Sequence, residues 1–166
     1  MSLIVSSIEV QYYSVYYLAA DIGGNLFTNV ILLSIGASVS GIVAGYLINV
    51  YSDVRVFQSF ALCTGIFNLV FYFVSDAIFK YICFILTAFG AAAQFCVIFI
   101  IVELRIPPEN IGAAIAIVLT IGNVAAAISP FVGQSGYPTA MLCITCLALV
   151  NIGLTLLLSK PGSYLP

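Results

Sequence analysis

The sequence predicts an all-α membrane protein, a polytopic bundle of six transmembrane helices. Of its 166 residues, 63% are hydrophobic and only 6% are charged, and the mean hydropathy is +1.23, whereas about a quarter of the residues in soluble domains are charged. The long charge-free runs are residues 22–52, 56–75, 81–102 and 110–159. Because about 20 apolar residues form a helix that crosses the bilayer core, we expect a bundle embedded in the lipid bilayer.

Short connectors divide the chain into six expected spans, which together form one membrane domain over residues 1–166. Every connector contains charged residues, glycine or proline, which interrupt apolar helices. We place the spans at residues 3–20, 26–51, 54–74, 81–102, 111–132 and 139–159. The first span ends in Ala19-Ala20 as a signal peptide could, but it lacks basic residues at its start and contains Glu9, so we assign it to the mature protein.

The basic residues predict the orientation of the bundle. Lysine and arginine in short loops remain on the cytoplasmic side of a membrane. Arg55, Arg105 and Lys160 fall on one face of the expected bundle, and Lys80 falls alone on the other. We therefore expect a multi-pass integral protein of the plasma membrane with both termini in the cytoplasm.

Composition and charge exclude several classes of function. A net charge of −2 with four lysine and arginine residues leaves no basic surface to neutralise phosphates, so we expect no nucleic-acid partner. The chain has no histidine, and its five cysteines lie in apolar runs, which argues against a metal site and a disulfide scaffold. The sequence offers no set of base, nucleophile or metal ligands, so we expect neither an enzyme nor a cofactor.

The first span carries one polar and aromatic face. At 100° per residue, an arc of about 140° contains Ser6, Glu9, Tyr12, Tyr13, Tyr16 and Tyr17. A carboxylate within a membrane costs roughly 2.5–3.5 kcal/mol and usually faces a cavity or a partner, and tyrosine rings attract organic cations. The alternative is an interfacial belt of tyrosines in which Glu9 reaches toward the membrane surface.

Polar residues of later spans are further candidates for a solute cavity. Gln94 and Asn123 each lie within a run of small residues that would let a ligand approach. Either side chain could instead hydrogen-bond a neighbouring helix. Glu103 and Arg105 lie two residues apart at the expected cytoplasmic end of the fourth span, where an ionic latch or a solvated loop is a better interpretation than an acid–base pair.

Three segments carry a resemblance to a known transporter family. Tyr12-Tyr13, followed by Gly-Gly-Asn-Leu-Phe-Thr-Asn at residues 23–29, is similar to the seventh span and the next loop of that family. Glu103-Leu104 with Pro107 is similar to the end of its tenth span, and Ser129-Pro130-Phe131 to its eleventh. The chain as a whole resembles the C-terminal half of the major facilitator superfamily, closest to the organic cation/carnitine and organic anion transporter group.

The resemblance implies half of a twelve-helix fold, in which two six-helix halves enclose a solute site near the bilayer midplane and rock to alternate its exposure. We expect Met1 to be an internal methionine of a longer protein, and the alternative is that this half pairs with another chain or with a second copy of itself. Arg55, Glu103 and Arg105 would form a cytoplasmic gate. Where the family places an aspartate or an arginine according to substrate charge, this chain has Asn123, so the charge of the solute stays open.

The sequence therefore predicts transport of small organic solutes, either organic ions or zwitterions, by alternating access. The residues expected to line the solute cavity are Tyr12, Tyr13, Tyr16, Gln94 and Asn123, and Glu9 is an expected charge partner or proton site. The alternative is a non-transporting scaffold or assembly subunit, in which a partner helix covers the tyrosine face of the first span.

Overall fold

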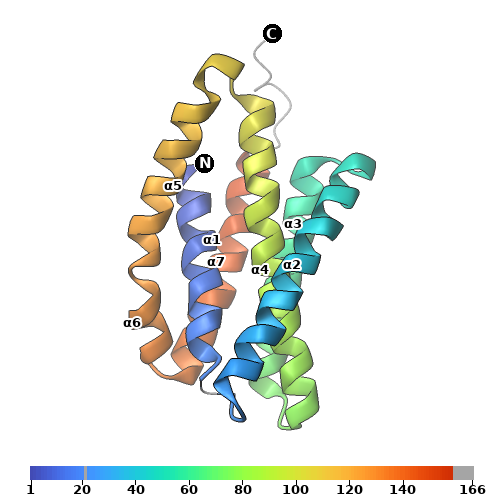
Figure 1. Ribbon diagram of the computed structural model, residues 1–166, viewed down its shortest axis with the longest axis vertical. Helices are drawn as coiled ribbons and strands as arrows, with labels where there is room; N and C mark the ends of the chain where they lie inside the picture. Colours follow the sequence, from blue (N-terminus) through green and yellow to red (C-terminus); the bar gives the residue numbers. More distant parts are fainter. Residues whose placement is uncertain (21, 159–166) are drawn as a thin grey trace.

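The computed structural model describes residues 1–20 and 22–158, and every regular element among them is helical. The helices are α1 (Ser2–Leu18), α2 (Leu26–Val50), α3 (Asp53–Phe73), α4 (Ala77–Arg105), the 3-10 turn η1 (Pro108–Asn110), α5 (Ile111–Ala126), α6 (Ser129–Gln134) and α7 (Tyr137–Leu158). They lie side by side as an elongated bundle (Figure 1). The predicted all-α class is confirmed.

Five helical stretches of the described chain are long and apolar enough to cross a membrane. They are Leu26–Val50, Asp53–Phe73, Ala77–Arg105, Pro108–Gln134 and Pro138–Leu157. The remaining long helix, α1, has 17 residues and is about 26 Å long at 1.5 Å per residue, slightly short of the roughly 30 Å hydrocarbon core. The helices are thus consistent with a multi-pass integral membrane protein, and the first of the six expected spans is not among these five stretches.

The helices depart most from the expected spans in α4, which also ends at Arg105 rather than at residue 102, and in the fifth span. The start of α4 and the division of the fifth span follow from side chains that cap or break the helices. α4 begins at Ala77 rather than at residue 81, because Asp76 accepts hydrogen bonds from the backbone N–H groups of Ile78 and Phe79 at 3.0 and 3.1 Å. The expected fifth span is divided into α5 and α6. Pro130 in the first turn of α6 has no N–H group to continue the helical hydrogen bonds.

Two central helices, α1 and α4, organise the packing. α1 lies against α4, α5, α6 and α7, and α4 also packs against α2 and α3 (Figure 1). The apolar core has one cluster around Phe57 and Ile98 and another around Phe71 and Ile144. α2 packs mainly on α4 and hardly touches α1, which leaves space between the two helices.

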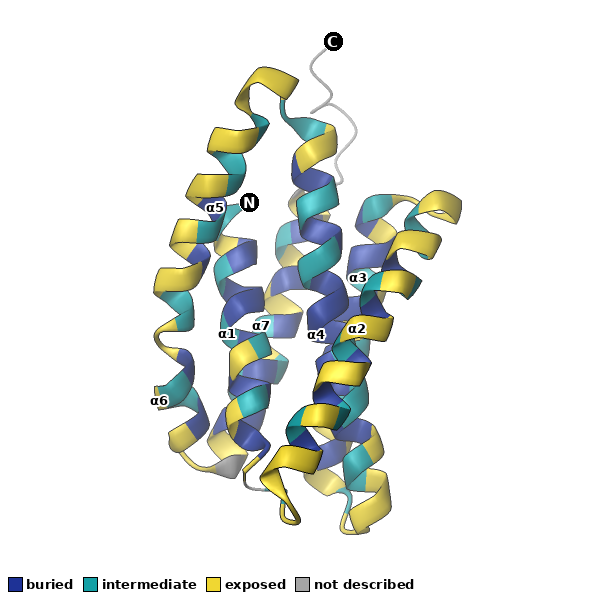
Figure 2. Cartoon of the chain, in the orientation of Figure 1, coloured by how far each residue is buried: buried dark blue, intermediate teal, exposed yellow. Residues whose placement is uncertain are grey.

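Burial is uneven across the bundle. In the apolar 18-residue segment of α4, 61% of the residues are buried. The corresponding share is 22% for α2 and only 11% for the α5–α6 stretch. Figure 2 shows the resulting exposed faces along α2 and α5, with the buried residues gathered on α1 and α4 between them. The least covered helices therefore flank the central pair.

The connection between α1 and α2 is held by side-chain hydrogen bonds to the backbone. The amide of Asn29 donates to the carbonyl oxygens of Ala19 and Gly23, both at 2.9 Å, and the Tyr81 hydroxyl also donates to Gly23 at 2.9 Å. Gly23 and Gly24 have φ angles of +91° and +74°, which glycine adopts without strain. The end of α1 is thereby tied to the beginning of α2.

Candidate functional site

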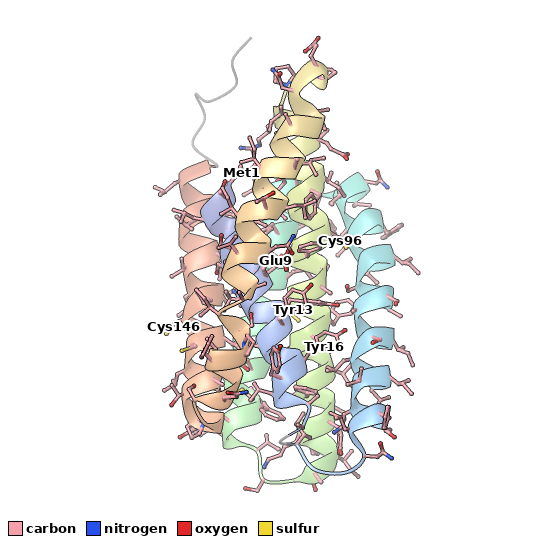
Figure 3. All side chains as sticks on the ribbon, turned by 60° about the vertical axis from the view of Figure 1, so that its left-hand side comes forward. Met1, Glu9, Tyr13, Tyr16, Cys96 and Cys146 are labelled. Carbon is pink, nitrogen blue, oxygen red and sulfur yellow. The ribbon has the colours of Figure 1, made fainter. Side chains whose placement is uncertain are left out.

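A groove lies between α1 and α2, with α4 as its floor. It encloses about 380 Å³ and is lined by Glu9, Tyr12, Tyr13, Tyr16, Ser34, Ala37, Ser38, Ala92, Phe95 and Cys96. Figure 3 shows Glu9, Tyr13 and Tyr16 along α1, with Cys96 of α4 nearby. The groove exists because α2 rests on α4 rather than on α1. α2 therefore leaves the groove side of α1 open, whereas α5 packs against Glu9 at Gly122.

The tyrosines form a continuous aromatic wall on α1. The ring centroid of Tyr12 lies 5.4 Å from that of Tyr13 and 5.0 Å from that of Tyr16, and the hydroxyls of Tyr12 and Tyr16 are 3.1 Å apart. A second hollow of about 440 Å³ is lined by Tyr12, Tyr13, Tyr16 and Tyr17. Spacings of three and four residues place these rings on one side of a helix, as the sequence predicts.

Glu9 is the acidic group of the groove and is only 3% exposed. A Cβ added to Gly122 of α5 would lie 3.1 Å from Glu9 Cγ and 3.4 Å from its Oε1 atom, so the absence of a side chain at Gly122 makes room for the carboxyl group. Among the described residues, no hydrogen bond or salt bridge to Glu9 is found. The described basic residues Arg55, Lys80 and Arg105 lie near helix ends, so none of these three side chains compensates the carboxylate.

The opposite wall of the groove adds hydrogen-bond acceptors. The hydroxyls of Ser34 and Ser38 donate to the carbonyl oxygens of Val30 and Ser34, at 2.8 and 2.9 Å. A hydroxyl that donates in this way retains acceptor capacity at its oxygen. Together with the carboxyl group of Glu9 and the tyrosine rings, these oxygens suit a ligand that carries positive charge or N–H donors.

Gln94 lies outside this groove, in a polar seam that we define as Thr64, Asn68, Gln94 and Asn151. The Gln94 amide donates to Thr64 Oγ1 at 2.9 Å and accepts from Asn151 at 3.1 Å. Asn68 donates to the Met141 carbonyl oxygen and to Thr145 Oγ1, both at 2.7 Å. These bonds join α3, α4 and α7, so the structure does not bring Gln94 together with the tyrosines.

Asn123 also lies outside the lining of the groove. It is exposed on α5, next to Gly122, which packs against Glu9. The side chain therefore lies near the acidic group along the helix but on a neighbouring face of the bundle. Of the six sequence-predicted binding residues, the structure brings Glu9, Tyr12, Tyr13 and Tyr16 together and leaves the two amides apart.

The expected gate residues lie near one end of the bundle but do not form one cluster. Arg105 Nη2 lies 3.7 Å from Asp53 Oδ2, and the two side chains are 25% and 22% exposed. Glu103 and Arg55 are exposed. The partner of Arg105 in this salt bridge is therefore Asp53, the first residue of α3. The sequence contains a signal for this salt bridge: Asp53 lies at the start of α3, at the same end of the bundle as the last turn of α4, which carries Arg105.

Sequence reasoning also missed the groove residues of α2 and α4. Ser34, Ala37 and Ser38 lie three and four residues apart, which places them on one face of a helix, and Cys96 follows Gln94 by two positions. The periodicity of α2 could have identified the serine face. Nothing in the sequence shows that this face meets Cys96 across the groove.

Inward-facing polar residues of α1 form a separate feature. Gln11 and Ser14 are fully buried, and Gln11 donates to Ser7 at 3.4 Å. Within the described residues, Gln11 Oε1, Ser14 Oγ and Asn151 Oδ1 have no hydrogen-bond partner. These atoms lie in the interior of the bundle and do not line the groove.

Comparison with known proteins adds no family assignment. No model of a protein family matches the chain, and no curated protein is significantly similar to it. The functional argument therefore depends on the geometry of the groove.

Proposed function

We propose that this chain is one six-helix half of a membrane transporter that carries small organic solutes, organic ions or zwitterions, by alternating access. The observation that carries the proposal is the groove of about 380 Å³, whose α1 wall consists of Glu9, Tyr12, Tyr13 and Tyr16. Carboxylates inside membrane bundles face cavities or partners and mark solute or proton pathways. This groove provides such a carboxylate beside aromatic rings and hydroxyls.

In this proposal α1 also crosses the membrane and brings the number of spans from five to six. Its 17 residues are at the lower end of the lengths that cross a bilayer. Its polar face would be costly against lipid, which favours an aqueous cavity on that side. The proposal agrees with the resemblance of the sequence to the second half of a major facilitator transporter.

The counterpart of this half would cover the poorly buried faces of α2 and α5. These helices are the least buried of the membrane-length stretches, and they flank the two helices that carry Glu9 and Cys96. A second six-helix bundle, an N-terminal half or another chain, would close the cavity on this side and rock against it. Arg55, Glu103 and Arg105 would then act as gate elements at the cytoplasmic end in a plasma membrane.

Thiol accessibility tests this proposal. With the five native cysteines replaced, Tyr13→Cys should react with a water-soluble, membrane-impermeant thiol reagent in proteoliposomes, because Tyr13 lines the groove and is 40% exposed. Leu149→Cys on the outer helix α7 is the matched control: Leu149 is 59% exposed but would face lipid, so its thiol should react slowly. Equal protection of both thiols under all conditions would support the scaffold alternative and contradict the transporter.

A further inference from the structure

We propose that a hollow between α3 and α7, on the outer surface of the bundle, binds the hydroxyl end of a sterol from the surrounding membrane. The hollow has a volume of about 110 Å³. Two of its lining side chains, Asn68 and Thr145, are polar, and the rest are apolar or aromatic, including Leu69, Tyr72, Phe73 and Leu142. This site is separate from the groove between α1 and α2, and it does not depend on transport.

The amide group of Asn68 is oriented so that its oxygen faces the hollow. Its nitrogen donates to the carbonyl oxygen of Met141 and to Thr145 Oγ1, both at 2.7 Å, and a backbone carbonyl can only accept. Asn68 Oδ1 accepts no hydrogen bond from the described residues, yet it is not among the fully enclosed atoms that lack a partner. An unpaired acceptor on a side chain that is only 1% exposed therefore opens onto the hollow.

Thr145 supplies a donor beside this acceptor. The hydroxyls of Thr64 and Thr120 donate to the carbonyl oxygen four residues earlier in their own helices. For Thr145 that carbonyl belongs to Met141, which already accepts from Asn68, and no hydrogen bond donated by Thr145 is found within the described chain. The hollow thus offers one acceptor and one donor side by side, and a single hydroxyl group, which both donates and accepts, satisfies both.

The depth of this polar pair favours a neutral ligand over a phospholipid headgroup. α3 has 21 residues and is about 31 Å long, which matches the roughly 30 Å hydrocarbon core. Asn68 lies five residues before Phe73, the last residue of α3, or about 8 Å inside that end of the helix. A charged or zwitterionic headgroup would lose its hydration at this depth, and none of the described residues that line the hollow is charged. A hydroxyl group costs much less to bury, and its two hydrogen bonds offset that cost.

The shape of the hollow favours a rigid ring next to the hydroxyl. An apolar cavity of about 150 Å³ holds one benzene molecule, so this hollow has room for one ring, and the rest of the ligand would lie along the outer surface of α3 and α7. The rings of Tyr72 and Phe73 stand 5.1 Å apart at 89° and offer flat surfaces to such a body. A rigid ligand also loses less conformational entropy on binding than a flexible chain does. A sterol combines these properties, because its only hydroxyl lies on a terminal ring of a fused, apolar skeleton.

Tryptophan quenching tests the inference on the full-length chain in phosphatidylcholine vesicles, because the chain has no tryptophan of its own. Phe73→Trp places a single indole at the hollow, where Phe73 is 73% exposed. Phe79→Trp is the matched control: Phe79 lies in the first turn of α4 at the same end of the bundle, is 61% exposed, and is not part of the hollow. Ring-brominated cholesterol should quench Phe73→Trp at a mole fraction at least about threefold lower than Phe79→Trp. Brominated phosphatidylcholine should quench both alike.

Competition shows whether the hydroxyl group is recognised. In Phe73→Trp, unlabelled cholesterol should relieve the quenching by brominated cholesterol. Cholestane has the same ring skeleton without the hydroxyl group, so it should relieve the quenching at least about threefold less effectively.

Variants of the polar pair identify the protein groups that bind the hydroxyl. In the Phe73→Trp chain, Thr145→Val removes the donor at nearly equal side-chain volume and should weaken sterol binding about three- to tenfold. Thr120→Val is the matched control, because the exposed Thr120 hydroxyl of α5 donates only to its own helix, at Ala116. This variant should bind the sterol as the parent chain does. If Thr145→Val does not fold, the comparison of cholesterol with cholestane decides the question.

The outcomes are independent of the proposed function. Equal quenching of Phe73→Trp and Phe79→Trp by brominated cholesterol, or equal relief by cholestane and cholesterol, overturns the site. Relief by a diacylglycerol, which carries its hydroxyl on flexible chains, but not by cholesterol overturns the choice of a sterol. None of these results changes the reactivity expected of Tyr13→Cys, which tests the transporter separately.

Discussion

The polar seam and the groove differ in how far their side chains are already paired, although Asn151 Oδ1 of the seam has no hydrogen-bond partner among the described residues. In the polar seam, the amides of Asn68, Gln94 and Asn151 donate to groups of neighbouring helices, and interhelical bonds of this kind hold membrane helices together. In the groove, Glu9 has no partner within the described chain. A polar residue in a membrane helix thus indicates ligand binding only when the neighbouring helices leave it unpaired.

The largest expected loss of stability comes from a substitution that disrupts the close packing of helices beside the polar seam. A Cβ on Gly90 would lie 2.5 Å from Thr64 Oγ1 and 2.9 Å from the Phe60 carbonyl oxygen, so Gly90→Ala should destabilise the bundle by about 1–3 kcal/mol through overpacking. Gly45 on α2 has no atom within 4 Å of an added Cβ. Gly45→Ala should therefore leave stability unchanged or slightly raised, as measured by unfolding in mixed detergent micelles. Equal losses in both variants would contradict the packing described for α3 and α4.

A smaller loss of stability is expected from removing a hydrogen-bonding side chain of the polar seam, and a still smaller one from removing a hydroxyl group of the groove. Gln94→Leu removes the bonds to Thr64 and Asn151 and should cost about 1–2 kcal/mol, because it also leaves a buried amide unpaired. Tyr16→Phe removes only the hydroxyl contact with Tyr12 at the open groove and should cost less than about 0.5 kcal/mol. The same micelle unfolding assay compares them, and a greater loss for Tyr16→Phe would show that the tyrosine wall is structural.

The smallest expected effect concerns the salt bridge between Arg105 and Asp53. Its 3.7 Å separation and partly exposed side chains predict that Asp53→Asn changes the free energy of unfolding by no more than about 1 kcal/mol. Because the pair is partly open to solvent, the difference from the wild type should shrink further at high salt. A loss as large as that of Gly90→Ala would mean that this end of the bundle contributes much more to stability than its geometry indicates.

The fold was largely predictable because membrane helices are read from length and hydropathy. The predicted second span, 26–51, agrees with Leu26–Val50 to one residue. The division of the fifth span was missed, although Pro130 is a signal for it. The early start of α4 was missed as well, because it depends on capping by Asp76.

The candidate site was predictable only within single helices. Periodicity along α1 groups Glu9 with Tyr12, Tyr13 and Tyr16, and the structure places these four in one groove. For Gln94 the sequence favoured a cavity over a contact with a neighbouring helix, because periodicity identifies a helix face but not the neighbour it meets. The acceptor of its hydrogen bond is Thr64, 30 residues earlier in the chain.

The hydrogen bonds of Asn29 fix the C-terminal end of α1, so any tilt of α1 would take place about this end. Because this amide fastens the last turn of α1 to the first turn of α2, a tilt of α1 would displace each residue in proportion to its distance from Ala19. Glu9 is ten residues from that point and Tyr16 is three, or about 15 and 5 Å along the helix. In such a tilt the backbone of Glu9, which carries the carboxyl group, would move roughly three times as far as the backbone of Tyr16.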